Sequence, residues 1–195
     1  MSQAIKVFID TEFTSLEDAH LISIGLISET NKEIYLETNN WQTKQVSNFC
    51  REKVIPLLNN HDVSISPQNI NLKLKQWFSQ FEDVTIMVDN NIDIRLFVNL
   101  FDQLPNNISQ AYDISEYIKH VSKILWFNSY PNHYEKAATK LINRFFFLTT
   151  QYYSIEQISS HHAMSDAKAN KYAFEEIEKY FNYPITQILQ QTLSY

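Results

Sequence analysis

Two kinds of hydrophobic pattern run along the chain, and together they predict both strands and helices. Apolar runs rich in β-branched and aromatic residues predict strands at residues 4–10, 20–28, 33–38 and 84–88, and residues 109–112 predict a short last strand. Apolar residues at helical spacing predict helices over residues 43–58, 67–81, 92–100, 134–147 and 163–181. Three successive strands, followed by strands that alternate with helices, predict an α/β fold with helices packed on a mixed sheet.

Local polar residues predict where some of these elements begin. Residues 28–32 have the composition of a hairpin turn, and Pro67 suits the first turn of a helix. Asp113 and Glu116 have the spacing of a capping box, and Asp89 is placed to cap the helix that follows the strand at 84–88.

Composition narrows the functional classes. A chain of 195 residues with 44% apolar residues predicts one domain over residues 1–195 with a single core. A net charge of −6 argues against a broad basic face that coats nucleic acid, and a single glycine excludes a glycine-rich phosphate loop. Cys50 alone provides neither an internal disulfide nor a thiolate cluster. No apolar run approaches a membrane span and the N-terminus does not resemble a signal peptide, so we expect a cytoplasmic protein.

The first predicted strand ends in a pair of acidic residues. Asp10 and Glu12 are separated by one residue, so their side chains lie on the same side of an extended chain. Crowded carboxylates are unfavourable unless a cation compensates them, and a divalent metal ion is a natural partner. An isolated pair of this kind more often marks a turn cap, here Asp10, and a solvated glutamate, here Glu12, so the interpretation depends on other acidic residues.

Two further signals lie where a metal site would need them. Asp93 falls in the first turn of the helix after the strand at 84–88, and ligands of mixed sheets collect at such strand ends. His161 and His162 precede a predicted helix that carries Asp166. Either histidine could serve an acidic site formed by these elements.

In order and spacing, the signals resemble the motifs of the DEDDh 3′–5′ exonucleases, which have a ribonuclease H-like fold. Residues 10–16 resemble the D-x-E-T-T-G-L segment of that family, with Phe13 in place of a threonine and Ser15 in place of the glycine. Residues 21–25 resemble the I-x-E-I-G strand that follows it. Ile92 and Asp93 resemble the second motif, F-D, and residues 161–167 resemble the third, H-x-A-x-x-D-A. The sequence of these segments is most similar to that of a small bacterial and phage exoribonuclease branch, and it is also similar to those of RNase T and oligoribonuclease.

The resemblance implies a mixed five-stranded sheet flanked by helices and a site that binds two metal ions. Its carboxylates are Asp10, Glu12, Asp93 and Asp166, and oxygen ligands of this kind suit Mg²⁺ or Mn²⁺. By the family pattern, Asp10 bridges the ions, Glu12 and Asp166 complete one site, and Asp93 acts partly through water. His161 is the implied general base and is preferred to His162, because its register also places Ala163 and Ala167 on family positions.

The implied activity is 3′–5′ exonucleolytic hydrolysis that releases nucleoside 5′-monophosphates. We expect single-stranded RNA 3′ ends as substrate, with DNA as the second candidate, and Glu12, Phe13 and Leu16 as the substrate contacts. No membrane partner is expected, and a homodimer is suggested because related enzymes are often dimers. Two alternatives stay open: a non-catalytic nucleic-acid or protein-binding module on the same fold, and a hydrolase of dinucleotides or other small phosphodiesters.

Overall fold

A computed structural model of the protein describes residues 4–58, 64–183 and 185–190. The strands are β1 (Ile5–Phe13), β2 (Leu21–Ser28), β3 (Glu33–Thr38), β4 (Ser64–Ile65), β5 (Val84–Val88) and β6 (Ile108–Asp113). The helices are α1 (Asn48–Lys53), α2 (Pro67–Phe78), α3 (Asn91–Val98), α4 (Ile114–Trp126), α5 (Tyr134–Glu156), α6 (Ala163–Glu178) and α7 (Ile185–Gln190). Short 3₁₀ turns cover Asn40–Thr43, Ile55–Leu57 and Lys179–Asn182.

The strands form one mixed sheet in the order β4-β3-β2-β1-β5-β6. β2 runs antiparallel to β1 and β3, whereas β5 is parallel to β1 and β6 is parallel to β5. The expected mixed five-stranded sheet is therefore confirmed in β3-β2-β1-β5-β6, and the two-residue β4 extends its β3 edge.

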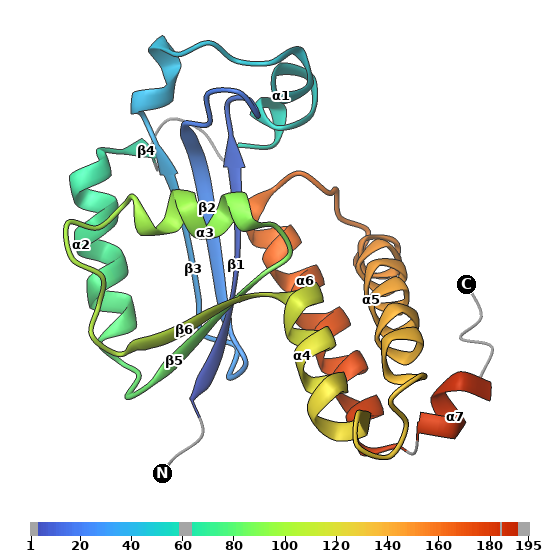
Figure 1. Cartoon of the computed structure of the whole chain (residues 1–195). Helices are drawn as coiled ribbons and strands as arrows, with labels where there is room; N and C mark the ends of the chain where they lie inside the picture. Colours follow the sequence, from blue (N-terminus) through green and yellow to red (C-terminus); the bar gives the residue numbers. More distant parts are fainter. Residues whose placement is uncertain (1–3, 59–63, 184, 191–195) are drawn as a thin grey trace.

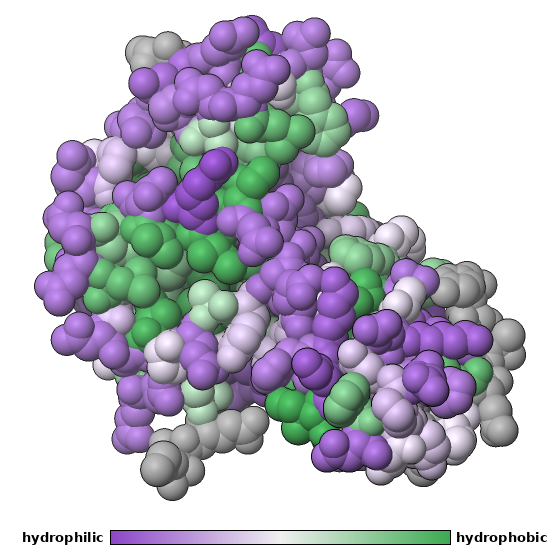
Figure 2. Space-filling view, viewed as in Figure 1, coloured by the Kyte–Doolittle hydropathy of each residue, from purple (hydrophilic) through white to green (hydrophobic). Residues whose placement is uncertain are grey.

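Helices cover both faces of the sheet (Figure 1). Alternate residues of β1 face opposite ways, so Phe8 joins a core with α4, α5 and α6, whereas Val7 and Ile9 join a core with α2 and α3. On the face seen in Figure 2, apolar residues gather over α2 and α3, where partly buried residues such as Leu100 and Phe101 pack against the second core. β1 is thus the central strand on which both layers depend.

Most predicted elements are present, but several boundaries differ. The helix predicted over residues 134–147 continues to Glu156 as α5. β1 continues to Phe13, because residues beyond Asp10 still pair with β2 through Phe13 and Leu21. The helix predicted over residues 43–58 is wrong in extent. Ser47 caps α1 by accepting a hydrogen bond from the Cys50 N–H, and Pro56 lies in a separate 3₁₀ turn. Part of the region where that predicted helix was to end, residues 59 and 60, lies outside the described residues.

The turn predicted at residues 28–32 and the cap predicted at Asp113 have the expected local structure. Asn31 adopts a positive φ of 62° in the turn between β2 and β3, as a tight hairpin requires. Asp113 caps α4 by accepting hydrogen bonds from the Ser115 and Glu116 N–H groups. Among the described residues, no helix combines the length and apolar content of a membrane span.

At Gly25 the backbone of α6 packs directly against the sheet. It lies in β2 directly opposite Asp10, and a Cβ built on it would fall 2.5 Å from the backbone carbon of Ala163 and the backbone nitrogen of Met164. Real Cβ atoms essentially never come that close, and the atoms met are backbone, which cannot rotate away. The absence of a side chain at Gly25 therefore lets α6 begin directly over Asp10.

We expect Gly25→Ala to lower the free energy of unfolding by about 1–3 kcal/mol, because the added methyl group overpacks the interface between β2 and α6. Urea unfolding measures this change. Ser109→Thr, which adds a methyl group at an exposed position of β6, is the control and should change stability little. Equal stability of Gly25→Ala and wild type would contradict the close packing described for α6.

Candidate metal centre

Asp10 and Glu12 of β1 point to the same face of the sheet, toward α6, and both are buried, with 9% and 8% of their surface exposed. Thr11, between them, faces α3 and donates hydrogen bonds from its N–H (3.1 Å) and its hydroxyl (2.5 Å) to Asp93 Oδ1. This strand segment therefore connects the acidic residues of the α6 face to the first turn of α3.

The joint between β5 and α3 contributes two carboxylates rather than one. Asp93, only 2% exposed, lies in the first turn of α3, and ligand oxygens of Asp10, Asp89 and Asp93 lie within 4.8 Å of one another. The interpretation of Asp89 as the helix cap is wrong. Asn90 caps α3 by accepting a hydrogen bond from the Ile92 N–H, which leaves the Asp89 carboxylate available to the cluster.

The loop before α6 contributes the remaining group. Ligand atoms of Glu12, His161 and Asp166 lie within 4.8 Å of one another. His161 has a positive φ of 68°, and its N–H donates a 2.9 Å hydrogen bond to Asp166 Oδ2. An uncommon backbone conformation is thus held by the carboxylate that shares the site with the imidazole.

His162 has a different environment. It occupies the N-cap position of α6, stacks on the Tyr35 ring with centroids 4.5 Å apart, and has a buried Nδ1 without a hydrogen-bond partner. It is not a member of either group of neighbouring ligand atoms in the described part of the chain. Of the two candidate histidines, the structure therefore brings His161 to the carboxylates.

Burial and mutual repulsion disturb the titration of all these carboxyl groups. Burial, with the neighbouring Asp93 and Asp166 charges, raises the pKa of Asp10 well above its usual value. Burial, followed by repulsion from Asp166 and Asp93, raises the pKa of Glu12 to about 8. Burial also raises the pKa of Asp93 to about 7 and that of Asp166 to about 6. Hydrogen bonds from Thr11 oppose the shift at Asp93, and the Tyr153 hydroxyl and the His161 N–H oppose the shift at Asp166.

Asp89 and Tyr153 also lie near the acidic residues, although no sequence motif marks either of them. Burial raises the pKa of Asp89, and the amide of Asn170 on α6 opposes the shift. Burial and the nearby Asp166 charge raise the pKa of Tyr153, which reaches the site from α5. Asp89 could have been suspected from its position at a strand end, whereas Tyr153 depends on how α5 packs against α6.

The donor set fits divalent metal ions. Carboxylate oxygens are the ligands that Mg²⁺ and Mn²⁺ prefer, and Asp166 Oδ1 is buried without a hydrogen-bond partner. The two groups of ligand atoms, Asp10 with Asp89 and Asp93 and Glu12 with His161 and Asp166, provide a separate set of donors for each ion of a two-ion site. A bound cation would also relieve the repulsion that raises these pKa values.

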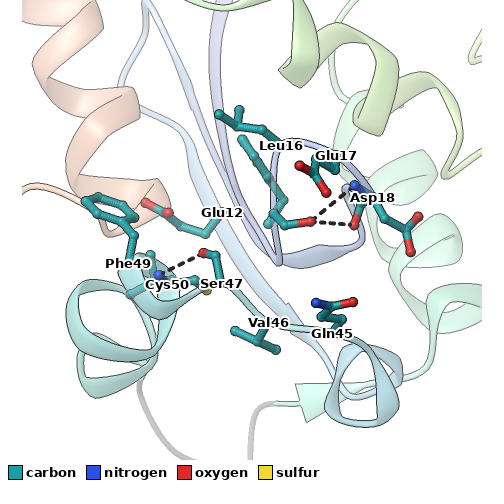
Figure 3. Close-up of a pocket in the computed structure, with 12 residues that line it drawn as sticks. Glu12, Leu16, Glu17, Asp18, Gln45, Val46, Ser47, Phe49 and Cys50 are labelled. Carbon is teal, nitrogen blue, oxygen red and sulfur yellow. Dashed lines mark hydrogen bonds between the residues drawn. The ribbon is translucent and has the colours of Figure 1, made fainter.

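A pocket of about 560 Å³ opens beside Glu12 (Figure 3). It is lined by Glu12, Phe13, Ser15, Leu16, Glu17, Asp18, Gln45, Val46, Ser47, Phe49, Cys50 and Val54. Leu16 is 74% exposed in the turn after β1, whereas Phe13 is only partly exposed and also packs on the core beneath β1. The described lining residues include neither lysine nor arginine.

Two solved structures have the same overall fold as this chain. A structure described as a full-length 3′-exonuclease matches with a TM-score of 0.53 and 15% identity over 90% of this chain and 82% of that chain. Another, described as 3′-end-specific recognition of a histone mRNA stem-loop by a 3′-exonuclease, matches with a TM-score of 0.51 and 11% identity over the same shares. The chain has the ribonuclease H-like fold of these 3′-exonucleases. No protein-family model and no curated protein matches the sequence.

The raised carboxyl pKa values predict an unusual pH dependence for the metal-free protein. The folded state keeps protons that the unfolded chain has lost, so stability falls as pH rises from about 4 to about 8. We expect the Tm in EDTA to be lower at about pH 8 than at about pH 5, and Glu12→Gln to flatten this slope. Mg²⁺ should raise Tm more at the higher pH. A metal-free Tm that increases through this range would contradict the burial of the acidic residues.

Asp89 and Asn90 are adjacent in the sequence, so variants at these two positions separate the role of the acidic cluster from that of the α3 helix cap. Asp89→Asn removes a repelled charge, so we expect a higher Tm in EDTA and a smaller rise in Tm on addition of Mn²⁺. Asn90→Ala removes the cap of α3, so it should lose about 1 kcal/mol of stability and keep the Mn²⁺ response. Reversed behaviour of the two variants would show that Asp89 is the structural residue.

Proposed function

We propose that the protein is a DEDDh-type, metal-dependent 3′–5′ exonuclease that acts on single-stranded RNA and releases nucleoside 5′-monophosphates. One observation carries this proposal: five carboxylates and His161 form two groups of neighbouring ligand atoms, and a pocket lies beside them. A fold shared with 3′-exonucleases and the motif order in the sequence support the same activity.

In this proposal the carboxylates hold two divalent ions, Mg²⁺ or Mn²⁺. Asp10, Asp89 and Asp93 would hold one ion, and Glu12 and Asp166, which share the other group with His161, would hold the second. Bound ions would supply an activated water and charge neutralisation at the phosphodiester. Holding the ions at fixed positions is the contribution of the buried carboxylates, since their oxygens are anchored by β1, α3 and α6.

His161 takes the proton from the attacking water in the proposed reaction. Its ring lies among the ligand atoms of Glu12 and Asp166, so an imidazole nitrogen is within reach of a water held there. Burial lowers the pKa of His161 from its usual value, with a further contribution from the Lys53 charge, so the ring is neutral and able to accept a proton near neutral pH.

The pocket beside Glu12 would receive the 3′-terminal nucleoside. Its volume of about 560 Å³ lies within the range for small-molecule sites, and Leu16 and Phe13 give it apolar surface for a base. Ser15, which replaces the family glycine, accepts a hydrogen bond from the Asp18 N–H and so shapes the turn that carries Leu16. RNA is favoured as substrate because the 3′-exonuclease of one matched structure recognises an mRNA stem-loop.

The decisive experiment follows a 5′-labelled, single-stranded RNA in the presence of Mg²⁺ or Mn²⁺. We expect shortening from the 3′ end, inhibition by EDTA, and no activity in Asp10→Asn. His161→Ala should lose about 10²–10⁴-fold in kcat, the usual contribution of a general base. His162→Ala should retain activity far above that of His161→Ala.

Matched substrates separate the alternatives. DNA of the same sequence tests sugar preference, and dinucleotides tested against longer oligomers identify a hydrolase of small phosphodiesters. If neither RNA nor DNA is degraded with either metal, whereas both bind, the protein is a binding module and the proposed activity is wrong.

A further inference from the structure

Phe49 is an exposed aromatic side chain on a firmly anchored helix. It is 55% exposed, although Cys50 and Val54 of the same segment are only 1% and 2% exposed and pack with Ile22. An isolated exposed phenylalanine is ordinary, but this one lines the pocket beside Glu12 (Figure 3). Its exposed surface is therefore available to whatever fills the pocket.

The position of Phe49 is tied to the acidic strand. The Ser47 N–H donates a 2.9 Å hydrogen bond to the Thr14 carbonyl at the end of β1, and the Ser47 hydroxyl caps α1. The buried Cys50 fixes the other side of the helix. Phe49 thus has a fixed location relative to Glu12, although α1 is short.

The Phe49 ring also contacts the His161 ring. The two centroids are 4.9 Å apart with an interplanar angle of 84°, an edge-to-face arrangement. The backbone of His161 is held by Asp166, but the described residues form no hydrogen bond with its imidazole nitrogens. In the described part of the chain, Phe49 is therefore the aromatic contact that restrains the orientation of this ring.

From this geometry we propose that Phe49 is a positioning residue that couples occupancy of the pocket to the orientation of His161. A nucleobase in the pocket covers the exposed part of Phe49, restricts its rotamers and so holds its contact with the imidazole. Leu16 also lines the pocket and is 74% exposed, but it has no aromatic ring to pack against the imidazole, so we assign it to binding alone. The inference rests on the proposed function, because it assigns His161 the role of base and the pocket the terminal nucleoside.

The kinetic test compares variants that separate binding from positioning. With single-stranded RNA and Mn²⁺, Phe49→Ala should lower kcat by about tenfold or more, a part of the about 10²–10⁴-fold contribution of a general base. Phe49→Trp should retain kcat within about threefold because it keeps an aromatic edge. Leu16→Ala should raise KM and leave kcat nearly unchanged. Phe146→Ala, at a 46% exposed phenylalanine on α5, is the control and should match wild type.

A double-variant cycle tests the route through His161. In a His161→Ala background, Phe49→Ala should cause no further loss of kcat, because the residue it positions is gone. An equal loss of kcat in both backgrounds, or a change confined to KM, would overturn the proposal. Tm of each variant verifies that it is folded.

A readout without catalysis separates this inference from the proposed function. NMR signals of the His161 ring in the metal-free protein should shift in Phe49→Ala and stay unchanged in Phe146→Ala, because only the first variant removes a neighbouring ring. Unchanged His161 signals in Phe49→Ala would refute the contact. If wild type is inactive but these shifts occur, the exonuclease proposal fails and the contact between the two rings remains established.

Discussion

The contact between Gly25 and the start of α6 is the constraint on which the candidate site depends. Because the Ala163 backbone occupies the place of a Cβ at Gly25, the first turn of α6 lies against the sheet opposite Asp10. His161 precedes this contact and Asp166 follows it, so both are delivered to the face that carries Asp10 and Glu12. On the other side of β1, Thr11 attaches α3 and its Asp93 by two hydrogen bonds. One strand thereby joins the acidic residues of both helical layers.

This arrangement makes the metal-free protein electrostatically strained. Carboxylates are buried close together in a chain that already has a net charge of −6, and burial, followed by their mutual repulsion, raises the pKa values of Asp10 and Glu12. Thr11 and the His161 N–H donate hydrogen bonds to the cluster, but neither carries a positive charge. Divalent ions are the natural compensation, since each would introduce two positive charges among oxygen ligands. The same burial that opposes folding without metal favours ion binding, which links stability to the proposed activity.

Much of this arrangement could be predicted from the sequence because its signals are local. Strand runs, the Asp10 and Glu12 spacing, and the position of Asp93 after a strand all depend on neighbouring residues. The sequence does not separate Asp89 from Asn90 as the cap of α3, because both residue types are good caps and only the packing decides which one takes that role. Tyr153 and Phe49 could not be found in the same way, since each approaches the site through contacts between distant segments. The helix predicted over residues 43–58 is wrong in extent, because the Ser47 cap delays its start and Pro56 lies in a separate 3₁₀ turn, and apolar spacing alone does not show either limit.

Anomalous diffraction from crystals grown with Mn²⁺ and a nucleoside 5′-monophosphate tests the central claim most directly. The account predicts two manganese ions about 4 Å apart, one bound between Asp10, Asp89 and Asp93 and the other beside Glu12 and Asp166. It also predicts the base of the nucleotide in the pocket against Phe49 and Leu16. Manganese absent from these carboxylates, or a nucleotide bound elsewhere, would contradict it.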